Sequence, residues 1–257
     1  MRLRIAATIT YAYPGEASHA HLQARLAPAA TARQIVLVHP LSTEPTGWQL
    51  AHDDYWGTRV VELEVSDPHE RFTLSLISDV NLTGLGVKEP ADDFSPLDAP
   101  GVEDSFTEFL RPTPLTTLDE DDAEEARATR SASDTPAELV TKLTRQFADG
   151  RVGDDATHVV IAALRATGVP ARFVSGYRAP LGEFEPGTSA SGEVTSWLDH
   201  WDGAWQGWDP SVAQPVSDRH VIIGWGRDRS DAPPLRGIYG GPDGAECHVE
   251  VQVTRLA

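Results

Sequence analysis

Hydrophobic and polar residues alternate along the first 84 residues in the two-residue period that is typical of β-strands. Leu3 and Ile5 alternate with polar or small neighbours, and a proline-glycine turn is predicted at residues 11–15. A second turn is predicted at residues 53–57. Further strands are predicted at residues 21–28, 34–39, 58–65 and 71–80. Short strands at this spacing indicate an antiparallel, sandwich-like module over residues 1–84.

Residues 85–133 have a different composition. Five prolines punctuate the segment, and an acidic run at residues 119–122 is followed by Arg127 and Arg130. Acidic residues at the start and basic residues at the end complement the helix dipole, so a short solvated helix is predicted over residues 118–130. We interpret residues 85–133 as a connector.

Residues 134–257 form the second predicted module. Leu139, Leu143 and Phe147 recur at helical spacing after Pro136, which favours a helix that ends at Gly150. The spacing of apolar residues predicts a second helix from Asp154 or Asp155 to residues 168–170. A strand is predicted over residues 171–177, and residues 194–201 and 204–208 have the pattern of a hairpin.

The charge and cysteine content restrict the possible partners and compartments. The chain of 257 residues has 21 basic and 39 acidic residues, a net charge of −18. This balance argues against nucleic acid or an anionic membrane as a partner. The single cysteine, Cys247, excludes an intramolecular disulfide. No signal peptide and no membrane span is predicted, so we expect a cytoplasmic protein.

Several motifs of the second module, in order, resemble the bacterial transglutaminase-like family. Residues 151–158 and 168–177 are similar to the family's Gly-Val-Cys-Gln-Asp-Phe-Ala-His helix start and its Gly-Ile-Pro-Ala-Arg-Tyr-Val-Ser-Gly-Tyr strand. Residues 194–201 are similar to its Ser-His-Ala-Trp-Val-Glu-Val strand, and residues 205–211 to its Gly-Trp and Asp-Pro-Thr segment. The first 84 residues resemble the domain that precedes this core. The resemblance implies an α+β protein with a papain-like, transglutaminase-type core at residues 134–257.

The family's thiol chemistry needs a cysteine at a helix start, a histidine base and an aspartate that orients the histidine. The resemblance places the cysteine position at Gly153 and the histidine position at Thr195, or at Ser196 if the alignment shifts by one. The aspartate position, Asp209, is retained. The nucleophile and the base are therefore expected to be missing.

Other residues of the chain are candidate substitutes for the missing cysteine and histidine. Cys247 lies where the family has no nucleophile, and His200 follows Thr195 by five residues, which places it on the opposite face of a strand. Asp154, Asp155 and His158 share a helix face and, with Asp209, form a possible metal set, although a metal-free site is preferred. Asp154 with Thr195 is a possible acid–base pair. The candidate cleft residues are Asp154, Asp155, His158, Trp197 and Trp208.

We therefore expect a pseudoenzyme that needs no cofactor and binds a peptide, a protein or an active partner. The first alternative is an enzyme with reassigned, cysteine-free chemistry in the same cleft, such as a hydrolase or a biosynthetic cyclase. The second is residual amide hydrolysis or acyl transfer through Cys247.

Overall fold

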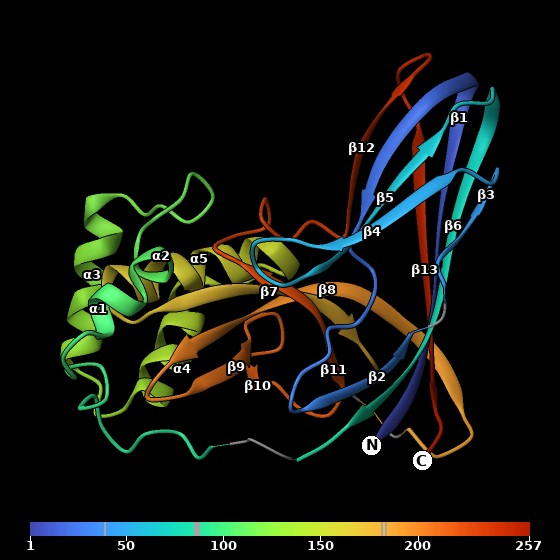
Figure 1. Cartoon of the computed structure of the whole chain (residues 1–257). Helices are drawn as coiled ribbons and strands as arrows, with labels where there is room; N and C mark the ends of the chain where they lie inside the picture. Colours follow the sequence, from blue (N-terminus) through green and yellow to red (C-terminus); the bar gives the residue numbers. More distant parts are fainter. Residues whose placement is uncertain (39, 85–87, 181, 183) are drawn as a thin grey trace.

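The structure, a computed structural model, describes residues 1–38, 40–84, 88–180, 182 and 184–257. Figure 1 shows two parts, a strand-rich part that carries both termini and a smaller sheet covered by helices. His39, the last residue of one predicted strand, lies outside the described residues. The strands of the first part are β1 (Arg2–Ala24), β2 (Gln34–Val38), β3 (Ser42–Glu44), β4 (Trp48–Asp53), β5 (Arg59–Val65), β6 (His69–Leu82), β12 (Leu235–Gly240) and β13 (Glu246–Arg255).

Strand β1 organises this part because it pairs with four other strands. Its first half lies between β6 and β13, and its second half lies between β5 and β12. The register with β6 shifts between Ala12 and Ala17, which marks a bulge in β1. The turn predicted at residues 11–15 is therefore wrong, because the chain continues as one strand. Pro14 has no N–H to donate, and it lies where β1 skips its ladder with β6.

The bend in β1 lets the sheet fold over its own hydrophobic side. Ile9, Leu22, Leu63 and Phe72 are buried in one cluster that both halves of β1 help to enclose. Alternating residues therefore line a core, as the sequence pattern predicted.

The last two strands return to the N-terminal module. Strand β13 pairs with residues 3–12 of β1, and β12 pairs with the second half of β1. The domain boundaries at residues 84 and 133 stay a prediction. Strands β12 and β13 belong to the predicted second module, but they share a sheet with β1 of the first. This pairing was not predicted, since nothing in a local pattern indicates a partner more than 200 residues away.

The second part is a curled sheet with helices on one face. Its strands are β7 (Ala171–Arg178), β8 (Ser189–Trp201), β9 (Trp205–Asp209), β10 (Gln214–Pro215) and β11 (His220–Gly226). Its helices are α1 (Val102–Ser105), α2 (Thr107–Leu110), α3 (Glu120–Ser131), α4 (Pro136–Phe147) and α5 (Gly153–Ala166). The strands β7, β8 and β9 and the helices α4 and α5 confirm the elements predicted from residue 136 to residue 208.

Helices α3, α4 and α5 bury their apolar faces together against this sheet. Leu139, Leu143, Val160 and Leu164 are fully buried there with Phe173 of β7. A capping box begins α4, because the Thr135 hydroxyl accepts a bond from the Glu138 N–H and the Glu138 carboxylate accepts one from the Asp134 N–H. None of the helices in the described ranges is both long and apolar enough to cross a membrane.

Several contacts hold the two parts together. Residues 189–192 of β8 pair with β13, while residues 193–200 pair with β7, so one strand belongs to both parts. The buried Gln34 amide bonds to the backbone N–H and carbonyl of Ile222 in β11. The Tyr177 hydroxyl donates to the Leu26 carbonyl at 2.8 Å. These contacts fix the two parts against each other.

Arg165 of α5 attaches the connector to the core. Its buried guanidinium donates to the backbone carbonyls of Phe109, Arg111, Ala171 and Arg227. Burial lowers the pKa of Arg165 to about 10, so the side chain stays charged at neutral pH. The connector is thus fixed by a cation that several carbonyl oxygens share.

Replacing Arg165 with methionine leaves these buried carbonyls without a donor. We expect the free energy of unfolding to fall by about 3 kcal/mol or more, since unsatisfied buried acceptors cost about 1–3 kcal/mol each. Urea denaturation measures the change. The matched control is Arg145→Met on the exposed side of α4, which should shift stability by less than about 0.5 kcal/mol. Equal losses in the two variants would contradict the role given to Arg165.

Candidate functional site

The first turn of α5 opens into a cleft. Gly153 begins the helix with φ +57°, and a Cβ built on it meets no atom within 4 Å. Its N–H donates to the Ser211 hydroxyl at 2.9 Å. Gly153, the predicted cysteine position, therefore faces open space beside a helix N-terminus.

Asp209, at the end of β9, is fully buried and has two charged or polar neighbours on other strands. Its Oδ2 accepts from Arg178 Nη1 at 2.5 Å and lies 3.1 Å from His220 Nε2. Its Oδ1 accepts the Ser211 N–H at 2.9 Å. Burial alone would raise the pKa of Asp209, but the His220 bond and the Arg178 charge outweigh it and hold the pKa below its usual value. The carboxylate is ionised and committed to this network, which we name the Asp209 network (Arg178, Asp209, His220).

Asp154, one residue after Gly153, is also held in place. Its Oδ1 accepts from the Ser196 hydroxyl at 2.7 Å, and its Oδ2 forms an ion pair with Arg229. Ser196 is buried and also contacts Thr157 of α5. If the histidine position were Ser196, its side chain would therefore be directed at α5.

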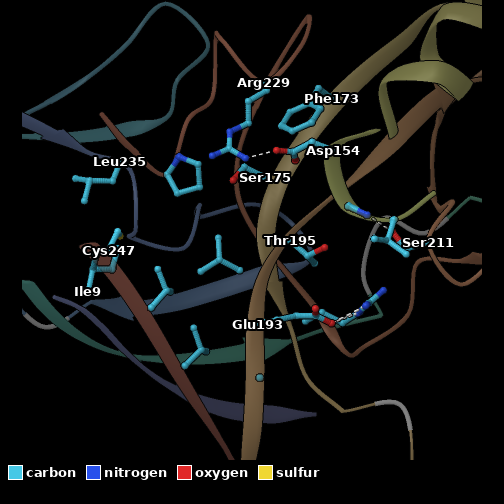
Figure 2. A pocket seen from close by; sticks show the side chains of 18 of the residues that line it. Ile9, Asp154, Phe173, Ser175, Glu193, Thr195, Ser211, Arg229, Leu235 and Cys247 are labelled. Atoms are coloured by element: carbon cyan, nitrogen blue, oxygen red, sulfur yellow. Dashed lines mark hydrogen bonds and ion pairs between the residues drawn. The ribbon is translucent and has the colours of Figure 1, made fainter. Parts of the chain in front are cut away.

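Gly153, Asp154, Arg178, Ser211 and Arg229 border a cavity of about 740 Å³ between the two parts of the protein. Figure 2 shows Cys247 and Ile9 on one side, with Thr195 and Ser211 on the other. The N-terminal sheet contributes apolar side chains, whereas the core contributes Arg178, Glu193, Asp154 and Arg229. Within the described part of the chain, no histidine lines this cavity. The chemistry of the wall is that of an apolar cleft with a charged rim.

Cys247 lies on the wall opposite Gly153, where it is exposed to the cavity and pairs in register with Tyr11 of β1. Burial raises the pKa of the Tyr11 hydroxyl, and its hydrogen bond with Cys247 raises it further. The phenol therefore stays neutral and supplies no base for the thiol.

The remaining predicted cleft residues lie elsewhere. Asp155 is exposed, and Trp208 is buried among the helices with its indole N–H bonded to Thr144. His158 stacks on Phe173, and its Nε2 accepts the Arg229 N–H. Burial lowers the pKa of His158, against the opposing charges of nearby aspartates, so the ring is neutral at pH 7. Trp197 is fully buried and lines a second cavity. Only Asp154 of this set borders the cleft.

Three residues of the possible metal set are bonded to other protein groups. Asp154 and Asp209 each have a cationic partner, and His158 accepts a backbone N–H. In the described ranges, no group of three His, Cys, Asp or Glu side chains is placed to hold a metal ion.

Comparisons with known proteins agree with the motifs. Residues 3–81 match the model of the bacterial transglutaminase-like N-terminal region, and residues 120–210 match that of the transglutaminase-like superfamily. The chain therefore contains a transglutaminase-like core region preceded by a bacterial transglutaminase-like N-terminal region. An uncharacterized protein of Mycobacterium leprae is 28% identical over 278 residues, which cover 100% of this chain and 99% of the relative. A second uncharacterized protein, from Mycobacterium tuberculosis (strain H37Rv), is 28% identical over 98% of this chain and 92% of its own length.

A solved structure supports the fold of this transglutaminase-like chain. A candidate cysteine protease from Cytophaga hutchinsonii superposes with a TM-score of 0.75 over 98% of this chain and 90% of that one. The two sequences are 19% identical, so this likeness shows the fold alone. The predicted α+β, papain-like core with a preceding β module is confirmed.

Sequence reasoning did not identify the partners of Asp209. Arg178 and His220 precede and follow it by 31 and 11 residues, on different strands. No local signal joins these residues, because their contact depends on the order of β7, β9 and β11 in the sheet.

The Asp209 network predicts a specific acid sensitivity. The pKa of Asp209 is lowered in the folded state, so its stabilisation is present at pH 7 and is lost as pH falls below about 4. Asp209→Asn should reduce the free energy of unfolding at pH 7 by about 3 kcal/mol, as when one partner of a buried ion pair is removed. Urea denaturation at pH 7 and pH 3 should show the difference shrinking in acid. The control is Asp218→Asn, because Asp218 is exposed. A difference in unfolding free energy between the wild type and Asp209→Asn that is the same at pH 7 and pH 3 would refute the lowered pKa of Asp209.

Proposed function

We propose that this transglutaminase-like protein is a non-catalytic binding protein whose cleft holds an extended segment of a peptide or protein partner. The observation that carries the proposal is the separation of thiol, imidazole and carboxylate. Gly153 offers no side chain, Cys247 lies on the opposite wall, and no histidine is among the described residues that line the cleft. Thiol acyl transfer needs these groups within hydrogen-bond reach of one another.

The Asp209 network supports the same conclusion. In the triad arrangement, a buried carboxylate orients the base that activates the nucleophile. Here the carboxylate is bonded to Arg178 and to His220, and His220 does not line the cleft. Asp154 is likewise paired with Arg229. Both carboxylates that reassigned acid–base chemistry would use are therefore in ion pairs.

The shape of the cleft is suited to recognition. Its volume falls within the roughly 300–1,000 Å³ that ligand pockets occupy. Ile9, Val249 and Val251 provide an apolar wall, and the ion pairs Arg178–Glu193 and Asp154–Arg229 provide polar groups at the rim. An apolar side chain on the wall, with backbone groups at the charged rim, is how such a surface would hold a peptide.

Filling the cleft should abolish binding without unfolding the protein. Val249 projects into the cavity and is 45% exposed, so Val249→Arg should occupy it at little cost to the fold. Peptides selected from a random display library on the wild type should bind this variant at least about tenfold more weakly, the loss of about 1.4 kcal/mol. Fluorescence anisotropy measures the dissociation constants.

The control is Ile77→Arg, since Ile77 is also 45% exposed but does not line the cavity. It should bind the selected peptides as the wild type does. Peptides that bind Val249→Arg and the wild type equally well would show that the cleft is not the binding site.

The family alignment can be tested by restoring the thiol pair. The variant Gly153→Cys with Thr195→His, made on Cys247→Ala, should react with iodoacetamide faster than a free thiol, because the helix N-terminus and an imidazole lower the pKa of a cysteine. The open space accepts the side chain, whereas φ +57° costs about 1–2 kcal/mol for a residue with a Cβ. Gly153→Cys alone is the control. Labelling no faster than for a free thiol would contradict the assignment of positions 153 and 195.

A further inference from the structure

A second cavity, of about 580 Å³, lies on the other side of the Asp209 network. Strands β8, β9 and β11 form one wall, and residues 31–34, 82–84 and 88 form the other. Gln206 of β9 anchors the second wall, because its amide donates to the Lys88 carbonyl at 3.2 Å. The cavity is built from both modules, and it shares only the network with the cleft.

The floor of this cavity is an oriented arginine between tryptophans. The Arg172 guanidinium lies 4.3 Å from the ring centroid of Trp205 and 5.0 Å from that of Trp225. Its Nε and Nη2 both donate to Asp199 Oδ2, at 2.9 and 2.8 Å. No hydrogen bond joins its Nη1 to another residue in the described ranges. The side chain is therefore fixed by stacking and by one carboxylate oxygen, and it keeps donors for a ligand.

The side chains that line the cavity have a positive net charge, whereas the whole chain has a negative one. Arg33, Lys88 and Arg172 line it against Asp199 and Asp218, an excess of 3 − 2 = 1 positive charge. The whole chain carries −18, and Lys88 is one of only two lysines in it. A local positive field of this kind concentrates small anions.

The aromatic side chains of the cavity indicate what the rest of the ligand is. Trp205 and Trp225 line the cavity and are partly exposed, and planar π-systems stack on such side chains. The buried indole N–H groups of Trp197 and Trp225 have no acceptor among the described residues. The wall thus offers ring surfaces, while Asp199, its buried carboxylate, is already paired.

We propose that this second cavity is a binding site for a small aromatic carboxylate, whose anionic group contacts Arg172 and whose ring lies against the tryptophans. Arg33 and Lys88 at the rim attract the anion. The site is distinct from the cleft and does not depend on the function proposed for it.

Fluorine NMR with 4-fluorobenzoate tests the site, and 4-fluorobenzylamine reverses the charge on the same ring. The carboxylate should show saturable binding near the millimolar range expected for so small a ligand, and the amine should not. Arg172→Lys, which keeps the charge but not the planar fork, should weaken binding about tenfold through loss of a charge-assisted hydrogen bond. Arg33→Gln or Lys88→Gln should each weaken it about two- to fivefold, as for partly exposed charges.

Two controls locate the binding. Lys142→Gln removes the other lysine, on α4, and Val249→Arg fills the cleft, so neither should change the affinity for 4-fluorobenzoate. Three results would overturn the proposal: no saturable binding of 4-fluorobenzoate, equal binding of the amine, or loss of binding in Val249→Arg but not in Arg172→Lys.

Discussion

The contact on which the rest of this structure depends is the buried carboxylate of Asp209 between Arg178 and His220. A charge that is fully removed from water is stable only when other groups satisfy it, and here a guanidinium, an imidazole and a backbone N–H do so. These groups come from β7, β11 and the turn after β9, so the carboxylate fixes three elements at once. Removing it would leave Arg178 partly unpaired in the interior.

The same network separates two cavities with different chemistry. Arg178 lines the cleft beside Gly153, whereas His220 lines the tryptophan-walled cavity, and Asp209 bonds to both. A ligand in either cavity would thus contact a residue that is hydrogen-bonded to the Asp209 carboxylate. Asp209 is therefore the group through which the walls of the two cavities are joined.

Local patterns predicted the elements, but not the long-range pairings. The spacing of Leu139, Leu143 and Phe147 was enough for α4, and the alternation around Trp197 was enough for the β8–β9 hairpin. The bend of β1 was missed because Pro14 resembles the end of a strand and a bulge has the same local composition. The return of β13 to β1 and the partners of Asp209 depend on sheet order, which no window of sequence contains. For the same reason the family motifs predicted triad positions at Gly153, Thr195 and Asp209, which stay a prediction, but not the groups that bond to the Asp209 carboxylate.

The central claim, that the cleft binds without turning over a substrate, is tested most directly by mass spectrometry. The wild type and Cys247→Ala would be incubated with a panel of amides, esters and amine acceptors, and the products followed over time. If the cleft only binds, neither sample should form a protein-dependent product. Turnover by the wild type that Cys247→Ala abolishes would show that the thiol of the opposite wall is catalytic. Turnover that survives in Cys247→Ala would show that the cleft has a rebuilt, cysteine-free active site. Either form of turnover would contradict the account.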